Sequence, residues 1–266
     1  MVAAEARGSA TRASATLIEL TNVRFGYTDE RPLLQGISLA VQAGEHVALI
    51  GRTGAGKCTV LHLAGGLFAP ASGQVSVAGI DPCSMTDAQR RERLGVAPQT
   101  LQLFSGSVLE NLTMGDGSVT RAAVEAATKA TGAHLIIRAL PQGYDTPLGG
   151  GDAGSVLFAG QRQLLALTRA LVHQPRVPLL DEATAAIDHA SDAAFCAALR
   201  SDAHDTQRGV LIVAHRLATA READRLVVLE GGHIVEQGPP DELIRRAGRF
   251  AALLAMEAAG WDWHSR

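Results

Sequence analysis

The sequence has few cysteines, few aromatic residues and no long apolar run, and these shortages exclude several classes of protein. Its three cysteines, Cys58, Cys83 and Cys196, are scattered along the chain. They therefore give neither a disulfide framework nor a metal cluster, and they favour a reducing compartment. No apolar run approaches the roughly 18 residues that a membrane span needs. Residues 1–15 also lack the apolar core of a signal peptide, so we expect any membrane role to depend on a partner.

The charges nearly balance, because the chain has 24 lysines and arginines against 27 acidic residues and a net charge of −3. Nothing in this balance indicates nucleic acid as the main partner. The 266 residues, 47% of them hydrophobic, suffice to bury the core of one large α/β domain or two closely joined subdomains. We expect that domain at residues 17–258, between a disordered leader or linker at 1–16 and a tail at 259–266.

One glycine-rich stretch organises the chain. It follows an apolar run at residues 46–50 that predicts a buried strand, and it precedes a predicted helix at 60–64. A backbone that curls between a strand and a helix points its N–H groups inward, and the helix N-terminus adds positive potential. Lys57 can then reach the outer phosphates of a nucleotide. The predicted phosphate-binding loop consists of Gly51, Arg52, Thr53, Gly54, Ala55, Gly56, Lys57, Cys58 and Thr59.

Cys58 departs from the usual pattern of such a loop, which has serine or threonine at this position. A hydroxyl there ligates Mg²⁺, and magnesium prefers oxygen to the soft sulfur of a thiol. Two interpretations stay open at this point. In one, Thr59 or a water molecule substitutes and little changes; in the other, the site binds nucleotide but handles the metal poorly.

An apolar strand predicted for residues 177–181 ends in two acidic residues, Asp181 and Glu182. Near a phosphate-binding loop, an aspartate at a strand end can hold Mg²⁺, and a second acid can orient or deprotonate an attacking water. Two adjacent acids can also be an ordinary solvated turn. Pro178 is unusual in such a strand, because proline removes a ladder hydrogen bond.

Other candidate residues lie at the ends of predicted elements. The strand predicted for residues 209–214 delivers His215 to the edge where ligands bind in open α/β sheets. A short strand ends at Gln99, and Tyr27, upstream of the loop, can stack on a base. The helix that opens at residues 160–163 offers free N–H groups as a second candidate anion site.

The remaining segments follow from periodicity and turn residues. Further strands are predicted at 17–20, 23–25, 37–41 and 73–79. Helical patterns occupy 85–93, 103–138, 164–173, 188–199 and 240–256. A hairpin joins residues 225–230 and 233–236 around Gly231 and Gly232.

Together these segments resemble the nucleotide-binding domain of an ABC transporter of the exporter type, from Leu17 to Met256. The motifs occur in the family's order along the chain. They are Tyr27 for the aromatic loop, Gly51–Thr59 for Walker A, Gln99 for the glutamine loop, Leu157–Gln161 for the signature, Val177–Asp181 for Walker B, Glu182 for the catalytic glutamate, Ala185–Asp188 for the D-loop and His215 for the switch histidine.

The resemblance implies an α/β fold of the P-loop NTPase type. Its parts are a RecA-like mixed sheet core, an antiparallel β subdomain and a helical subdomain near residues 100–173. It implies ATP and Mg²⁺ as cofactors, with nucleotide contacts from Tyr27, the loop Gly51–Thr59, Phe158, Gly160 and Gln161. The implied metal ligands are Cys58, Gln99 and Asp181, and the implied catalytic residues are Glu182, His215 and Gln99.

The resemblance also implies partners. Two such domains pair head to tail, trap ATP between Walker A of one and the signature of the other, and drive transmembrane domains at the cytoplasmic face of the cell membrane. Phe158 and Ala159 depart from the signature's serine and glycine. A phenyl ring offers no donor to a phosphate, and the extra methyl obstructs a close backbone approach. With Glu182 and His215 intact, this damaged signature resembles one half of a heterodimeric exporter with one competent and one degenerate site. Cys58 does not fit that interpretation, and Cys58, Phe158 and Pro178 together also allow an enfeebled or decaying copy.

Three functions are therefore considered. The first is an ATPase subunit or domain of an ABC exporter that works with a partner. The second is a degenerate subunit that binds ATP, barely hydrolyses it and serves dimerisation or regulation. The third is a soluble ABC-type ATPase of repair or translation, which the exporter-like Gln99 and His215 disfavour.

Overall fold

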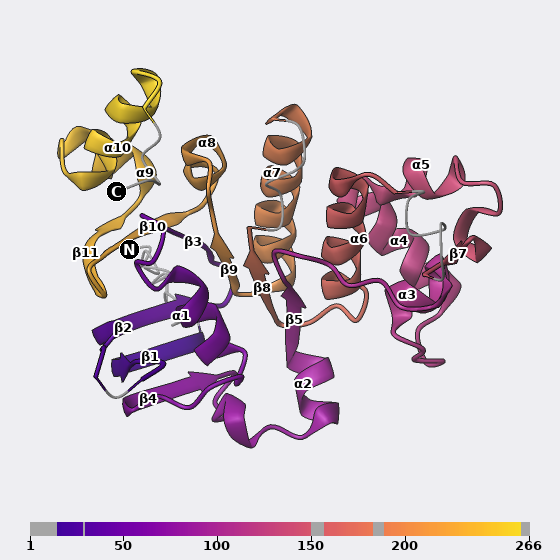
Figure 1. The fold of residues 1–266 in the computed structure, drawn as a ribbon, viewed down its shortest axis with the longest axis horizontal. Coiled ribbons are helices and arrows are strands. Elements are labelled where there is room, and N and C mark those ends of the chain that lie inside the picture. Colours follow the sequence, from indigo (N-terminus) through magenta and orange to yellow (C-terminus); the bar gives the residue numbers. More distant parts are fainter. Residues whose placement is uncertain (1–14, 29, 150–156, 183–188, 262–266) are drawn as a thin grey trace, which may run out of the picture.

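The computed structural model describes residues 15–28, 30–149, 157–182 and 189–261. Most of the predicted leader at 1–16, part of the tail at 259–266 and the D-loop stretch Ala185–Asp188 lie outside these ranges. Figure 1 shows a central sheet with a smaller antiparallel sheet on one side and a group of helices at the opposite end. None of the described helices combines the length and the apolar composition that a membrane span requires.

The central sheet has six strands. In spatial order they are β11 (His233–Gly238), β10 (Arg225–Glu230), β3 (His46–Gly51), β9 (Val210–Val213), β8 (Val177–Asp181) and β5 (Leu94–Ala97). The strands from β10 to β5 run parallel, whereas β11 pairs antiparallel with β10. The hairpin predicted around Gly231 and Gly232 is thereby confirmed. Parallel strands covered on both faces need apolar residues throughout, which explains the unbroken apolar runs in the sequence.

Successive residues of the central strands enter two different cores, as the alternation of side chains along a strand requires. Val47 and Leu49 pack on the side of α1 (Lys57–Ala64) and the antiparallel sheet. Ala48 and Ile50 pack on the opposite side, against helices from later in the chain. Those helices are α6 (Ala159–Leu171), α7 (His189–Thr206), α8 (Leu217–Arg221), α9 (Pro240–Arg245) and α10 (Arg249–Ala258).

The antiparallel sheet has the order β2–β1–β4. Its strands are β1 (Thr16–Phe25), β2 (Leu34–Gln42) and β4 (Ser72–Val77). The sequence predicts two strands at 17–20 and 23–25, but they form one strand with irregular pairing between Leu20 and Val23, where Asn22 has a positive φ of 49°. One face of the sheet shares the core that contains α1, so the sheet holds the first helix against the central strands.

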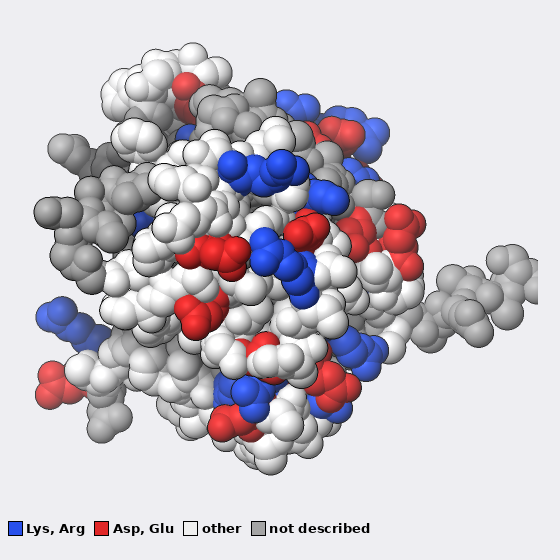
Figure 2. Space-filling model, turned by 90° about the vertical axis from the view of Figure 1, so that its right-hand side faces the viewer, with Lys and Arg blue, Asp and Glu red and all other residues white. Residues whose placement is uncertain are grey.

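The helical part has a core of its own, built around Val108, Leu112, Ile137 and Leu165. Its elements are β6 (Gly106–Ser107), α3 (Val108–Thr113), α4 (Arg121–Thr131), α5 (Ala133–Arg138), a 3₁₀ turn η2 (Gly143–Asp145), β7 (Pro147–Leu148) and α6. Figure 2 shows lysines, arginines and acidic residues interspersed over the face at this end of the molecule. That face has no continuous basic patch among its described residues.

The helical pattern at 103–138 is several short helices rather than a continuous one. Ser107 and Thr120 cap the N-termini of α3 and α4 with their side chains. Left-handed residues end both helices, Met114 at φ 55° and Gly132 at φ 79°. The predicted helix at 85–93 is shorter, because Thr86 caps α2 (Asp87–Arg93) after a 3₁₀ turn, η1 (Pro82–Ser84).

The prediction of a single helix over residues 240–256 is wrong. The segment consists of two helices, α9 and α10, that are separated where Ala247 takes a positive φ of 51°. Gly248 then precedes α10 in an extended conformation, and the Glu236 carboxylate accepts from the Phe250 N–H at 2.7 Å.

Pro178 lies in β8, between β9 and β5, where its register partner is Gly95.

One fully buried histidine lies outside the predicted site. His46 begins β3, and neither of its ring nitrogens has a hydrogen-bond partner. Its backbone N–H donates to Asp224, whose carboxylate also pairs with Arg200 at 2.8 Å and His204 at 3.0 Å. Burial lowers the pKa of His46 to about 4, although the Asp224 charge opposes this shift. The folded protein therefore disfavours a protonated ring at this position.

We expect the free energy of unfolding to fall as the pH drops from about 6.5 towards 4. In this range the unfolded chain protonates His46 and the folded chain does not, so protons favour the unfolded state. Below pH 4 the loss from this residue approaches about 3 kcal/mol, at about 1.4 kcal/mol per pKa unit.

Urea unfolding across this pH range measures the effect. His46→Leu removes the ionisation and should flatten this part of the profile. His233→Leu, which changes an exposed histidine of β11, should keep the parent slope. A His46→Leu profile as steep as that of the parent would contradict the expectation.

Candidate nucleotide-binding site

The loop between β3 and α1 packs closely against its neighbours. Gly51 and Gly56 have φ angles of 150° and 100°. A Cβ atom on Gly51 would lie 2.2 Å from the carbonyl oxygen of Leu229, and one on Gly56 would lie 2.4 Å from Leu34 Cδ2. The backbone contact therefore requires glycine at position 51, and the left-handed φ favours it at position 56. The loop lies between β10 and the antiparallel sheet.

Lys57 folds back over this loop. Its side chain is buried, and Nζ donates to the carbonyl oxygens of Gly51 at 2.7 Å and Arg52 at 3.0 Å. Burial lowers the pKa of Lys57, although nearby acidic groups oppose the shift. The ammonium group thus lies at the N-terminus of α1, where free N–H groups already favour an anion. This arrangement is suited to the phosphates of a nucleotide.

Tyr27 lies beside the loop. Its hydroxyl is 3.1 Å from Thr59 Oγ1, so one of the two hydroxyls donates to the other. The ring meets Phe25 and Phe68 edge to face, with centroids 5.1 and 5.4 Å away. Its 56% exposure leaves surface for a base to stack on. The adenine-stacking role stays a prediction.

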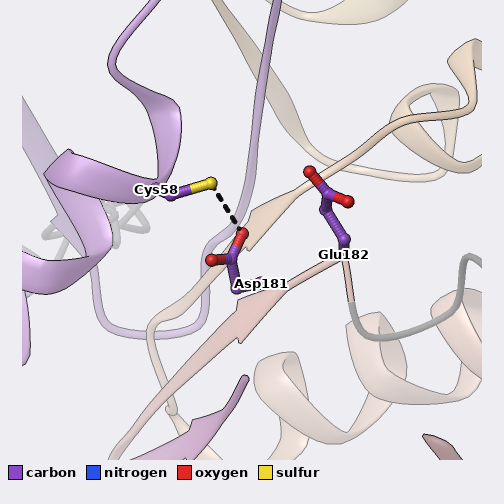
Figure 3. A group of neighbouring side chains, drawn as sticks. All are labelled: Cys58, Asp181 and Glu182. Atoms are coloured by element: carbon purple, nitrogen blue, oxygen red, sulfur yellow. Dashed lines mark hydrogen bonds between the residues drawn. The ribbon is translucent and has the colours of Figure 1, made fainter. Parts of the chain in front are cut away.

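Cys58 points from the first turn of α1 towards Asp181 at the end of β8 (Figure 3), and its thiol donates to Asp181 Oδ1 over 3.1 Å. Burial, this hydrogen bond and the charges of Asp181 and Glu182 raise the pKa of Cys58 to about 12. Burial likewise raises the pKa of Asp181, although the thiol hydrogen bond opposes the shift. The thiol is therefore protonated and bound to the carboxylate that the sequence assigns to a metal.

Glu182 is held at both carboxylate oxygens. Oε1 makes a close contact with His215 Nε2, and Oε2 accepts from Gln99 Nε2 at 2.5 Å. The backbone of Glu182 has a positive φ of 49°. Because Gln99, Glu182 and His215 follow the carboxyl ends of β5, β8 and β9, the parallel sheet brings the three predicted catalytic residues together.

The predicted metal ligands are only partly assembled. Cys58, Asp181 and Glu182 each contribute one ligand atom to a group in which all atoms lie within 4.8 Å of one another. Gln99, the third predicted ligand, is bonded to Glu182 instead. Its assignment as a metal ligand stays a prediction.

The signature segment begins α6, at a distance from the loop along the sheet (Figure 1). Phe158 is 77% exposed, and its backbone N–H donates to the side-chain oxygen of Gln161 at 2.9 Å. Within the described residues, no hydrogen bond joins Phe158, Gly160 or Gln161 to the phosphate-binding loop. That the loop and the signature of one chain belong to two different nucleotide sites stays a prediction.

Gln163 is a residue that the sequence does not single out. Its side-chain amide donates to the backbone carbonyl of Glu182 at 3.0 Å, which connects α6 to the end of β8. The sequence shows Gln163 in the first turn of a predicted helix, three residues after Gly160. Nothing in that spacing indicates its contact with a strand end.

Comparisons with known proteins identify the family of the chain. The ABC transporter family model matches residues 34–185. The mycobactin import ATP-binding/permease protein IrtB of Mycolicibacterium thermoresistibile is 39% identical over 250 residues, which are 94% of this chain and 42% of IrtB. The cyclolysin secretion/processing ATP-binding protein CyaB of Bordetella pertussis is 41% identical over 242 residues, which are 91% of this chain and 33% of CyaB.

A solved structure supports the same relationship. A bacterial Atm1-family ABC exporter with ATP bound matches with a TM-score of 0.83 and 36% identity, over 92% of this chain and 42% of that one. The site and fold define a P-loop NTPase of the ABC class, as expected. The chain belongs to the ABC transporter family, where it corresponds to the ATP-binding domain, and such domains are generally ATPases coupled to transport. It spans less than half the length of these relatives.

We expect Gly51→Ala to destabilise the protein by about 1–3 kcal/mol or more, because the added methyl forces the loop away from the Leu229 carbonyl. Gly54→Ala is the matched control: Gly54 also has a positive φ, 80°, but a Cβ there meets nothing within 4 Å. Urea unfolding of both variants measures the difference. Equal destabilisation would show that backbone strain, rather than the contact with β10, requires glycine at position 51.

Proposed function

We propose that this chain binds and hydrolyses ATP to power a membrane-spanning permease partner, as part of an ABC exporter. The observation that carries the proposal is a convergence of side chains at one edge of the central sheet. Lys57, Asp181, Glu182, His215 and Gln99 come from the ends of four different strands or the helix that follows one of them. The match to an exporter structure with ATP bound supports adenine nucleotide as the ligand.

In this proposal the phosphates of ATP lie in the loop Gly51–Thr59. Lys57 neutralises the β- and γ-phosphates, and Tyr27 stacks on the adenine. The amide N–H groups at the start of α1 add fixed positive dipoles. The loop is already folded, so ATP does not have to order it.

Glu182 orients the attacking water. In the described state both of its oxygens are engaged, by His215 and by Gln99. A bound γ-phosphate would offer these two side chains a charged acceptor, and charge-assisted hydrogen bonds are stronger than neutral ones. Their transfer to the phosphate would free the carboxylate to accept a hydrogen bond from water. Binding of nucleotide would thus release the Glu182 carboxylate from His215 and Gln99.

The Mg²⁺ implied by the resemblance fits these residues only in part. Asp181 offers a carboxylate oxygen, which suits a hard cation. Cys58 places sulfur where the loop pattern has a hydroxyl, and sulfur suits magnesium poorly. The donor set therefore fits Mg²⁺ at Asp181 but not at Cys58.

A second nucleotide-binding domain would complete each site. Phe158 is 77% exposed and Ala159, the first residue of α6, is exposed as well, so both are available to a partner. Phe158 offers no hydrogen bond to a phosphate, which would weaken the site that this chain completes on its partner. A different partner chain with an intact signature is therefore favoured over a second copy.

A groove fits the permease partner. It has a volume of about 620 Å³ and lies between α1, β5 and the helical part, with Leu67, Val96 and Met114 among the residues that line it. These three side chains are 65%, 47% and 55% exposed, and exposed apolar side chains grouped in this way indicate an interaction site. A segment of the permease seated there would place the chain at the cytoplasmic face of the membrane. IrtB and CyaB differ in what they move, so we assign no substrate to this chain.

The second candidate function is a degenerate subunit that binds ATP but hardly hydrolyses it. Cys58 and Phe158 favour it, whereas the assembled Gln99, Glu182 and His215 favour turnover. A soluble ABC ATPase of repair or translation is disfavoured, because the relatives are named as ATP-binding/permease or secretion proteins.

Glu182→Gln should leave ATP binding intact and lower turnover by about 10²–10⁴-fold, since it removes the general base. Steady-state ATPase of the chain mixed with its partner domain measures this. Glu92→Gln, at an exposed glutamate of α2, should keep the parent rate. If the parent binds ATP but shows no turnover above Glu182→Gln, the degenerate-subunit function is correct.

Phe158→Ser should increase ATP-driven dimerisation, because a hydroxyl replaces a bulky ring that cannot donate to the phosphate. Light scattering of this chain alone with ATP, in a Glu182→Gln background that prevents turnover at both sites of a self-dimer, measures the dimer fraction. Leu135→Ser removes an equally exposed apolar side chain, 78% exposed, from α5. An equal rise in both variants, or none in Phe158→Ser, would contradict a role of Phe158 at the shared site.

A further inference from the structure

We infer that the metal position of this site prefers a thiophilic divalent cation, such as Cd²⁺ or Zn²⁺, to Mg²⁺, with Cys58 Sγ and Asp181 as ligands. The inference rests on the proposed nucleotide site, because the metal would bind together with the nucleotide phosphates. Because a thiol suits Mg²⁺ poorly, Cys58 would shift the metal preference of the site towards softer cations.

The geometry places sulfur and carboxylate oxygen together. Cys58 Sγ lies 3.1 Å from Asp181 Oδ1, and an atom of Glu182 completes a group within 4.8 Å (Figure 3). Two elements far apart in sequence, α1 and β8, supply these atoms. Both are anchored in the core that also contains Val60 and Leu179, so the sulfur and the carboxylate are held in position by packing.

Thr59 does not replace the missing hydroxyl. Its Oγ1 is 3.1 Å from the Tyr27 hydroxyl, and the residue is 3% exposed. Successive residues of an α-helix point about 100° apart, because a turn contains 3.6 residues. Because Cys58 points towards Asp181, the Thr59 side chain points towards Tyr27 instead. Of the two interpretations left open by the sequence, substitution by Thr59 is thus disfavoured.

The donor set has the chemistry of a softer metal. Magnesium demands oxygen ligands in near-ideal octahedral geometry, and thiolate ligands select metals such as zinc. A thiol that coordinates a metal releases its proton to the solvent, and the resulting thiolate and the Asp181 carboxylate neutralise the divalent charge. Water and nucleotide phosphate oxygens would supply the other ligands. At the same position, Mg²⁺ would be bound by Asp181, water and phosphate oxygens but would gain little from the Cys58 sulfur.

The first test compares metals by nucleotide binding. Calorimetry of the full chain with a non-hydrolysable ATP analogue, in Mg²⁺ or Cd²⁺, gives an affinity ratio for the two metals. We expect the Cd²⁺-to-Mg²⁺ ratio to fall about tenfold or more in Cys58→Ser, since even outer ligand contacts change metal affinity by about 10–100-fold. An equal ratio in the parent and in Cys58→Ser would overturn the inference while leaving nucleotide binding intact. No binding with either metal would overturn the proposed function itself.

The second test observes the bond. Cd²⁺ added with the nucleotide analogue should produce a cadmium–thiolate charge-transfer band in the ultraviolet. Cys83→Ser is the matched control, since Cys83 is exposed and lies outside the site. The band should survive in Cys83→Ser and disappear in Cys58→Ser. A band that depends on Cys83 and not on Cys58 would overturn the inference.

Discussion

The site depends on how closely the loop after β3 packs against β10. Gly51 approaches the Leu229 carbonyl so closely that no side chain fits between them, and this approach sets the path of the chain into α1. Lys57 then folds back onto the carbonyls of Gly51 and Arg52. Cys58 and Thr59 take their positions from this helix, and they contact Asp181 and Tyr27 respectively. A one-carbon change at the loop would therefore disturb groups on both sides of the sheet.

The parallel sheet explains why residues far apart in the chain form one site. The carboxyl ends of β3, β8, β9 and β5 lie along the same edge, which is where open α/β sheets bind ligands. Glu182 follows β8, which lies between β9 and β5, and is restrained by His215 and Gln99. The signature segment at α6 lies apart from this group. In the proposed dimer, the loop and the signature of one chain would therefore serve two different nucleotide sites.

Much of this could be predicted from the sequence, because the strongest signals are local. The glycine–lysine turn and the apolar runs of β3, β8 and β9 identify the loop and the strands that deliver Asp181 and His215. Other features depend on tertiary packing. The direction of Thr59 follows from the rotation of α1 between Tyr27 and Asp181, and the bond from Gln163 to Glu182 follows from the docking of α6. The break at Ala247 has one local signal, Gly248, but the helical periodicity before and after it predicts a continuous helix.

Calorimetric titration of the chain with ATP, beside the Lys57→Ala variant, tests the central claim most directly. We expect the parent to take up adenine nucleotide and Lys57→Ala to bind it about tenfold to hundredfold more weakly, as the loss of one charged hydrogen bond to phosphate predicts. A parent chain that takes up no nucleotide, or a Lys57→Ala variant that binds as tightly as the parent, would contradict the claim that this loop holds ATP.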